Sequence, residues 1–105
     1  MKKLTVPDIM FATLSEDGQG MTQISAAQQL YRLVMFSQSP EGGFTVEDIR
    51  KRLPLGAKLE KANKTVLLED AEFVILQEAF KAATWRGVSP NIIALADAIE
   101  GAEGA

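Results

Sequence analysis

Residues 65–84 read TVLLEDAEFVILQEAFKAAT, and this stretch holds the strongest secondary-structure signals of the chain. The β-branched and aliphatic run Thr65–Leu68 predicts a short strand. Asp70 is expected to cap a helix that runs from Ala71 to about Thr84. The apolar residues of this helix occupy more than one of its faces: Phe73, Val74, Ile75, Leu76, Ala79, Phe80 and Ala83. So wide an apolar surface predicts a helix that is covered on more than one side.

A second helix is expected towards the end of the chain. Ser89 followed by Pro90 is a cap-plus-proline pair, which is typical of a helix start. The stripe expected to be buried consists of Ile92, Leu95, Ala96 and Ile99. The last residues, 102–105, contain only small residues and one glutamate, so we expect them to fray.

The beginning of the chain is predicted to form a helical hairpin over residues 4–38. Thr5 with Asp8 three residues later has the pattern of a helix start and predicts a first helix to about residue 14. Thr22 is expected to open the second helix. Its apolar residues recur at helical spacing: Ile24, Ala27, Tyr31, Val34 and Met35. A loop at 39–43, with one proline and two glycines, separates the hairpin from the rest.

A third helix start lies at residues 44–49, where FTVEDI echoes LTVPDI at residues 4–9. We interpret the echo as two similar helix starts, each with a threonine cap and an acidic first turn, rather than as a duplication. The helix from Thr45 is expected to end at Leu53, because Pro54 biases the residue before it away from helical geometry. After the proline, residues 55–62 could add a further helical turn or two.

These signals together predict an α+β domain, mainly α, with four or five short helices and one short strand or a two-stranded β element. A length of 105 residues fits one domain, 1–105. Its expected parts are the helical hairpin 4–38, the loop 39–43, a helix-strand-helix-helix part at 44–101 and the frayed tail 102–105. The strand is expected to pair either with residues 44–46 or with its copy in another subunit.

Composition argues against most catalytic chemistry. The chain has neither cysteine nor histidine, so it lacks the commonest zinc ligands, the usual general base and every histidine-activated nucleophile. The carboxylates of Glu69, Asp70 and Glu72 are explained by complementarity to a helix start. We therefore predict a protein that is not an enzyme, and we assign no catalytic, cofactor-binding or metal-binding residue.

Hydropathy gives no membrane signal. No apolar run approaches the ~20 residues that span a bilayer. The basic start at Lys2 and Lys3 is like that of a signal peptide, but Pro7 and Asp8 come before any long apolar run. The sequence therefore predicts a cytoplasmic protein with no membrane partner.

Apolar side chains are numerous for so small an interior, which predicts that some lie at an interface. The candidate protein-contact residues are Met35, Phe36, Trp85 and Arg86, which lie beside a loop or at a helix end. Such a surface, together with an unpaired strand edge, predicts a homo-oligomer.

A basic cluster within residues 50–64 offers an alternative function, a small DNA-binding regulator. The candidate nucleic-acid contacts are Arg50, Lys51, Arg52, Lys58, Lys61 and Lys64. The formal net charge of the chain is −3, and no aromatic residues are interleaved with these charges. We therefore favour a solvated helical face over a nucleic-acid surface.

From Thr65 onward the expected elements follow a set order: a strand, Glu-Asp, a long helix with aromatic residues, Trp85-Arg86-Gly87, Val88-Ser89-Pro90 and a short helix. This order resembles that of small accessory proteins encoded by bacteriophages and prophages. In that class a helical hairpin that resembles the stretch Ala26–Leu33 precedes this part. The resemblance implies a structural or morphogenesis role in a bacterial or phage-infected cell, and it brings no catalytic residues. The alternatives left open are the DNA-binding regulator and an inhibitor of a host protein.

Overall fold

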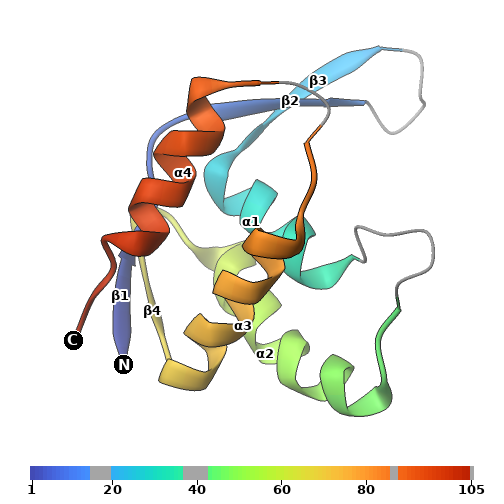
Figure 1. Cartoon of the computed structure of the whole chain (residues 1–105), viewed down its shortest axis with the longest axis vertical. Coiled ribbons are helices and arrows are strands. Elements are labelled where there is room, and N and C mark those ends of the chain that lie inside the picture. The colour runs from blue at the N-terminus through green and yellow to red at the C-terminus, as the bar shows by residue number, and fades with distance from the viewer. Residues whose placement is uncertain (15–19, 37–42, 86–87, 105) are drawn as a thin grey trace.

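The computed structural model of the chain describes residues 1–14, 20–36, 43–85 and 88–104. Within them lie four helices and five short strands, which form two small antiparallel sheets (Figure 1). The α+β class is confirmed. The predicted single strand or two-stranded element is wrong, because it leaves out most of the strands.

The first sheet has the order β4-β1-β5. Its central strand β1 (Lys2–Thr5) pairs with β4 (Thr65–Leu68) so that Lys2 lies opposite Leu68, and with β5 (Glu103–Gly104) on its other side. The strand at 65–68 is confirmed, but its partner is the start of the chain and not residues 44–46. The predicted fraying of 102–104 is also wrong, because Glu103 and Gly104 are held by this pairing; residue 105 lies outside the described residues.

The second sheet is a hairpin of β2 (Met10–Leu14) and β3 (Met21–Ser25), with Phe11 opposite Ile24. The predicted helical hairpin over 4–38 is therefore wrong for its first arm and for the start of its second. Leu4 is fully buried in β1 and Phe11 is buried in β2, with exposed neighbours on both sides along each strand. This two-residue alternation, and pairing with distant strands, outweighed the local helix-start signal.

Helix α1 (Ala26–Met35) begins three residues later than expected. Ser25, not Thr22, is its cap: the Ser25 hydroxyl accepts from the Gln28 backbone N–H, and the Gln28 side chain accepts from the Ser25 N–H. Both bonds satisfy backbone donors that a helix start leaves open. The buried face of α1 consists of Ala26, Ala27, Leu30, Leu33 and Val34.

Helix α2 (Val46–Lys61) begins at Thr45, whose hydroxyl and backbone N–H form a reciprocal pair with Asp48 as predicted. The predicted end at Leu53 is wrong, since the helix continues through Pro54. Leu55 and Leu59 beyond the proline are fully buried, and their burial offsets the backbone hydrogen bond that proline removes.

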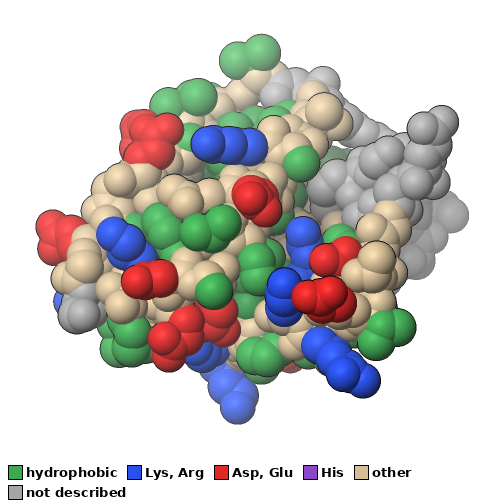
Figure 2. Space-filling view, turned by 60° about the horizontal axis from the view of Figure 1, so that its bottom comes forward, with side chains coloured by type: hydrophobic (Ala, Val, Ile, Leu, Met, Phe, Trp, Pro, Cys, Tyr) green, Lys and Arg blue, Asp and Glu red, His purple; other side chains and the backbone are tan. Residues whose placement is uncertain are grey.

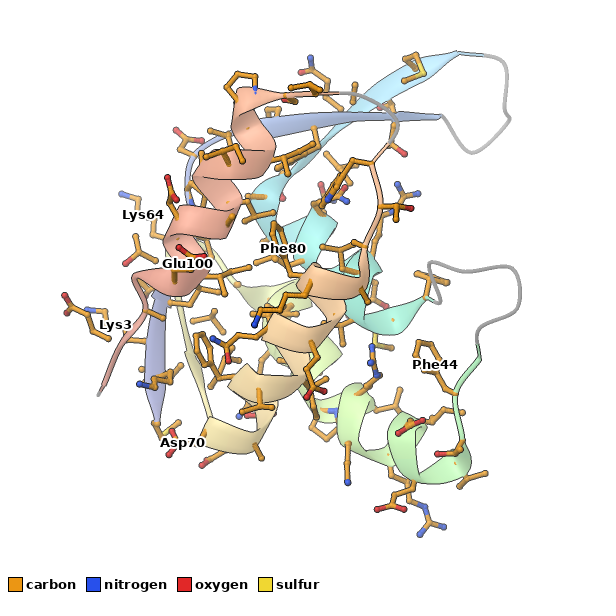
Figure 3. The ribbon with its side chains drawn as sticks, in the orientation of Figure 1. Lys3, Phe44, Lys64, Asp70, Phe80 and Glu100 are labelled. Carbon is orange, nitrogen blue, oxygen red and sulfur yellow. The ribbon has the colours of Figure 1, made fainter. Side chains whose placement is uncertain are left out.

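Helix α3 (Asp70–Ala82) follows β4 directly and begins after Glu69, one residue before the predicted cap. Helix α4 (Pro90–Glu100) begins as predicted, with the Ser89 hydroxyl accepting from the Asn91 N–H. The most deeply buried side chains come from both ends and the middle of the chain and form one cluster: Leu4, Leu30, Leu55, Leu59, Leu68, Leu76, Leu95 and Val34. Phe80 of α3, labelled in Figure 3, packs against this cluster.

Candidate protein-interaction site

The β2–β3 hairpin is fastened to two helices by side-chain hydrogen bonds. Arg32 of α1 donates from Nη1 to the Thr13 hydroxyl over 2.7 Å, and Asn91 of α4 donates from Nδ2 to the Met10 carbonyl oxygen over 2.8 Å. Figure 1 shows the hairpin extending along one end of the molecule beside α4. These bonds fix the hairpin relative to the helices, so the surface between them is preformed.

A groove of about 820 Å³ lies between the hairpin, α1 and the connection from α3 to α4. Its described lining is mostly apolar or uncharged: Met10, Phe11, Ala12, Thr13, Met21, Gln23, Gln29, Arg32, Leu33, Phe36, Thr84, Trp85, Val88, Ser89, Asn91 and Ile92. We call this feature the hairpin groove. Its size is within the range of sites that hold small molecules or peptide side chains.

Trp85 forms the aromatic floor of the hairpin groove. Its ring stacks on Phe11 at a centroid distance of 6.4 Å and tilts against Phe80 at 5.8 Å. The side chain is half-buried, so part of the indole is covered by the core and part faces the groove. A rigid, partly exposed indole is the kind of side chain that dominates protein-binding surfaces.

Large exposed apolar side chains surround this floor. Met21 is 66% exposed and Phe36 is 59% exposed, and Met10 and Val88 are exposed as well. Single exposed apolar residues are common on protein surfaces, but four that line one groove are a concentration of the kind found at interaction sites.

Arg32 is the only charged residue in the described lining of the groove. Arg32 is exposed, and its hydrogen bond to Thr13 is to a neutral hydroxyl. No Asp or Glu lines the described part of the groove, so its electrostatic field favours a carboxylate.

The structure divides the predicted contact residues. Phe36 and Trp85, which are far apart in the sequence, line the same groove. Met35 does not line it: its side chain packs against Gly56 at the contact between α1 and α2. Arg86 lies outside the described residues.

Sequence reasoning missed the hairpin side of the groove. The sequence predicted Met10 inside the first helix and Met21 just before the second. In the structure both are strand residues, Met10 at the start of β2 and Met21 at the start of β3. Residues 10–14 offered little signal of a strand, because four of these five residues are apolar and do not alternate with polar ones. The two-residue period exists only in the burial, with Phe11 buried between the exposed Met10 and Ala12.

Half of the basic cluster is engaged with neighbouring groups. Lys51 pairs with Glu47 at 3.2 Å, and Lys58 pairs with the mostly buried Glu72 at 2.6 Å. Arg52 donates to the Val34 carbonyl oxygen over 2.8 Å and lies 4.5 Å from the centre of the Phe44 ring. The contacts of Arg52 and Lys58 explain these two side chains by packing within the chain, whereas the Lys51–Glu47 pair is an exposed pair one helical turn apart.

The other three cations, Arg50, Lys61 and Lys64, are exposed and have no ion pair among the described residues. Figure 2 shows acidic and basic side chains interspersed across the face that it presents. The charge pattern is that of a solvated surface rather than one continuous basic patch.

The acidic residues at helix starts serve the backbone. Backbone and side-chain hydrogen bonds from Thr45 to the Asp48 carboxylate lower the pKa of Asp48 below its usual value. Glu72 accepts from both Lys58 and the Glu69 N–H. In the described ranges no group of three or more acidic side chains is arranged to hold a metal ion.

None of the described helices is both long enough and apolar enough to cross a bilayer. No protein-family model, no curated protein and no solved structure matches the chain.

Proposed function

We propose that this chain is a non-catalytic protein-interaction module that binds a segment of another protein in the hairpin groove. The observation that carries the proposal is that Met10, Met21, Phe36 and Val88, all exposed, line the same groove as the half-buried Trp85. Burying exposed apolar surface is the main favourable term in protein association, and a groove fixed by hydrogen bonds loses little entropy on binding.

The groove favours a partner segment of particular chemistry. An aromatic or aliphatic side chain would pack on Trp85, while a carboxylate beside it would pair with the exposed Arg32 guanidinium. We therefore propose an occupant with an apolar anchor next to an acidic residue.

The biological setting that we propose is that of a phage or prophage accessory protein with a structural or morphogenesis role. Its support is the resemblance in hydrophobic order over residues 65–101. Inhibition of a host protein would use the same surface, and the identity of the bound segment would distinguish the two roles.

Trp85 provides the assay, because it is the only tryptophan of the chain and lies in the groove. The peptides carry Phe, Trp or Leu next to either Asp or Lys. They are titrated against the protein while the emission of the Trp85 indole is followed. Peptides that contain tryptophan are followed by a label on the peptide instead. We expect the acidic peptides to bind more tightly, and Arg32→Gln to remove most of that preference.

A matched pair of variants separates the groove from general hydrophobicity. Val88→Asp places a charge at the groove, whereas Val46→Asp places the same charge on an equally small, exposed valine at the start of α2. We expect Val88→Asp to abolish peptide binding and Val46→Asp to preserve it. Equal binding by both variants, or no binding of any peptide to the wild type, would contradict the proposal.

The same preparations test the DNA-binding alternative, which the exposed Arg50, Lys61 and Lys64 favour. Retention on duplex DNA that weakens steeply with salt and is lost in a triple Arg50→Gln, Lys61→Gln, Lys64→Gln variant would support that alternative instead.

A further inference from the structure

Strand β4 lies at the edge of its sheet, since the order is β4-β1-β5. The Val6 N–H donates to the Lys64 carbonyl oxygen over 2.8 Å, which makes residues 6 and 64 a hydrogen-bonded pair in the antiparallel register. Hydrogen-bonded and non-bonded pairs alternate along such a ladder. Val66 and Leu68 therefore direct their backbone groups towards β1, whereas Thr65 and Leu67 direct theirs away from the sheet.

These outward backbone groups have no backbone partner within the described ranges of the chain. Thr65 is exposed, and Leu67 is 50% exposed, which is unusual for a leucine in the middle of a strand. An open strand edge with an exposed apolar residue is a template for pairing with another strand.

We propose that the outer edge of β4 pairs antiparallel with the same edge of a second copy of this chain. The two copies would then share one continuous sheet, which runs from β5 through β1 and β4 of one copy into β4, β1 and β5 of the other. The Leu67 side chain, on the exposed face of the sheet, would lie beside a side chain of the second copy's strand, which removes part of its apolar surface from water.

The backbone of Glu69 fixes the register of this pairing. Its N–H already donates to Glu72 Oε1 over 2.8 Å, and its carbonyl oxygen accepts from the Phe73 N–H over 2.9 Å. The pairing therefore cannot extend to Glu69. The register that uses only Thr65 and Leu67 places Thr65 opposite Leu67 of the second copy, with the two Val66 residues facing each other across the two-fold axis.

Charges at the two ends of β4 favour this antiparallel arrangement. The strand is preceded by Lys61 and Lys64 and followed by Glu69 and Asp70, and Figure 3 shows Lys64 and Asp70 at its opposite ends. Asp70 is paired with the Met1 ammonium over 3.1 Å, so the exposed Glu69 is the main negative charge offered to the second copy. In the register above, Lys64 lies opposite Leu68 of the second copy and so close to that copy's acidic end. The two-fold axis repeats this contact, and a parallel arrangement would instead bring like charges together.

The inference extends the interaction role proposed above to a second surface that shares no residue with the hairpin groove. Variants in the groove should leave the dimer unchanged, and variants at the β4 edge should leave peptide binding unchanged. Failure of one proposal is therefore distinguishable from failure of the other.

Sedimentation velocity over a series of concentrations, from micromolar to near-millimolar, tests the dimer on the full chain. The wild type should approach twice the monomer mass. Leu67→Pro removes an outward N–H and none of the bonds to β1, so it should be monomeric with an unchanged circular dichroism spectrum. If the proline variant fails to fold, Leu67→Lys, which keeps the backbone intact, gives the answer.

A charge-matched pair tests the register. Lys64→Glu should weaken the dimer about tenfold, because it places a carboxylate near the acidic end of the other copy. Arg50→Glu makes the same change of charge on an exposed part of α2 and should leave the dimer unaffected. A wild type that stays monomeric throughout, or a dimer that Leu67→Pro and Leu67→Lys do not weaken, would overturn the inference.

Discussion

Adding one methyl group at Gly56 should change the free energy of unfolding in the direction opposite to the one that helix propensity predicts. Gly56 lies inside α2 and is buried against Met35 of α1. Glycine in a helix interior is about 1 kcal/mol less favourable than alanine, so Gly56→Ala should stabilise the protein if the helix alone decided the outcome. The contact with α1 predicts the opposite.

A methyl group at Gly56 would overlap the Met35 sulfur and lie 3.1 Å from the Met35 Cγ. Overfilling a packed contact typically costs about 1–3 kcal/mol. After the gain of about 1 kcal/mol in helix propensity is subtracted, we expect Gly56→Ala to lower the free energy of unfolding by about 0–2 kcal/mol, with the low end reached if the flexible Met35 side chain shifts.

A double-mutant cycle with Met35→Ala isolates this clash. In the Met35→Ala background the methyl group has space, so Gly56→Ala should raise the free energy of unfolding by about 0.5–1 kcal/mol. Urea titrations followed by circular dichroism give the four values. Ala57→Gly at the neighbouring exposed position serves as the control and should show the helix-propensity loss alone.

The reasoning would be refuted by a Gly56→Ala variant that is more stable than the wild type, or by the same effect of Gly56→Ala in both backgrounds. Either result would mean that Met35 moves aside at no cost and that the glycine is not needed for the close approach of α1 and α2.

Further predictions concern helix starts, the proline and the core. Pro54→Ala should raise the free energy of unfolding by about 1–3 kcal/mol, since Pro54 is exposed and restoring its N–H completes the α2 ladder; a lower midpoint in urea would show that the proline is required. Asp48 has a lowered pKa in the folded state, so its stabilising contribution is present above its unfolded pKa and is lost as the pH falls through the folded value. Thermal melts should therefore show the wild type losing stability below about pH 4 more steeply than Asp48→Asn, and parallel curves would contradict this. Ser89→Ala should lower the free energy of unfolding by about 1 kcal/mol through loss of the α4 cap, whereas Ser89→Asp should restore most of it in the same urea assay. Leu95→Ala should lower it by about 2–5 kcal/mol because Leu95 is fully buried, with the exposed neighbour Ile93→Ala as a near-neutral control.

Local signals predicted the second half of the chain better than the first. The start of α4 depends on Ser89 and Pro90 alone, and β4 followed by α3 is encoded within about 20 adjacent residues, so no distant partner had to be known. The two echoing segments show the limit of this approach. Residues 44–49 start a helix, whereas residues 4–9 contain the end of a strand, because Leu4 is buried in a sheet with β4 and β5.

Tertiary contacts also explain the other errors. Pro54 has a strong local preference to end α2, but the buried Leu55 and Leu59 on its far side hold the helix together. In the candidate site, Phe36 and Trp85 were identified because aromatic residues next to loops or helix ends are often exposed. That these two residues share a groove with a β-hairpin follows only from the fold.

The central place of β1 has a consequence for synthesis of this protein on the ribosome. Residues 2–5 are translated well before either neighbouring strand, since one lies at 65–68 and the other at 103–104. The nascent chain must therefore keep β1 unpaired until residues 65–68 have emerged, and closing such long loops slows the formation of this sheet. Pausing of the ribosome before residues 65–68 have emerged should leave Leu4 accessible to chaperones that bind short apolar segments.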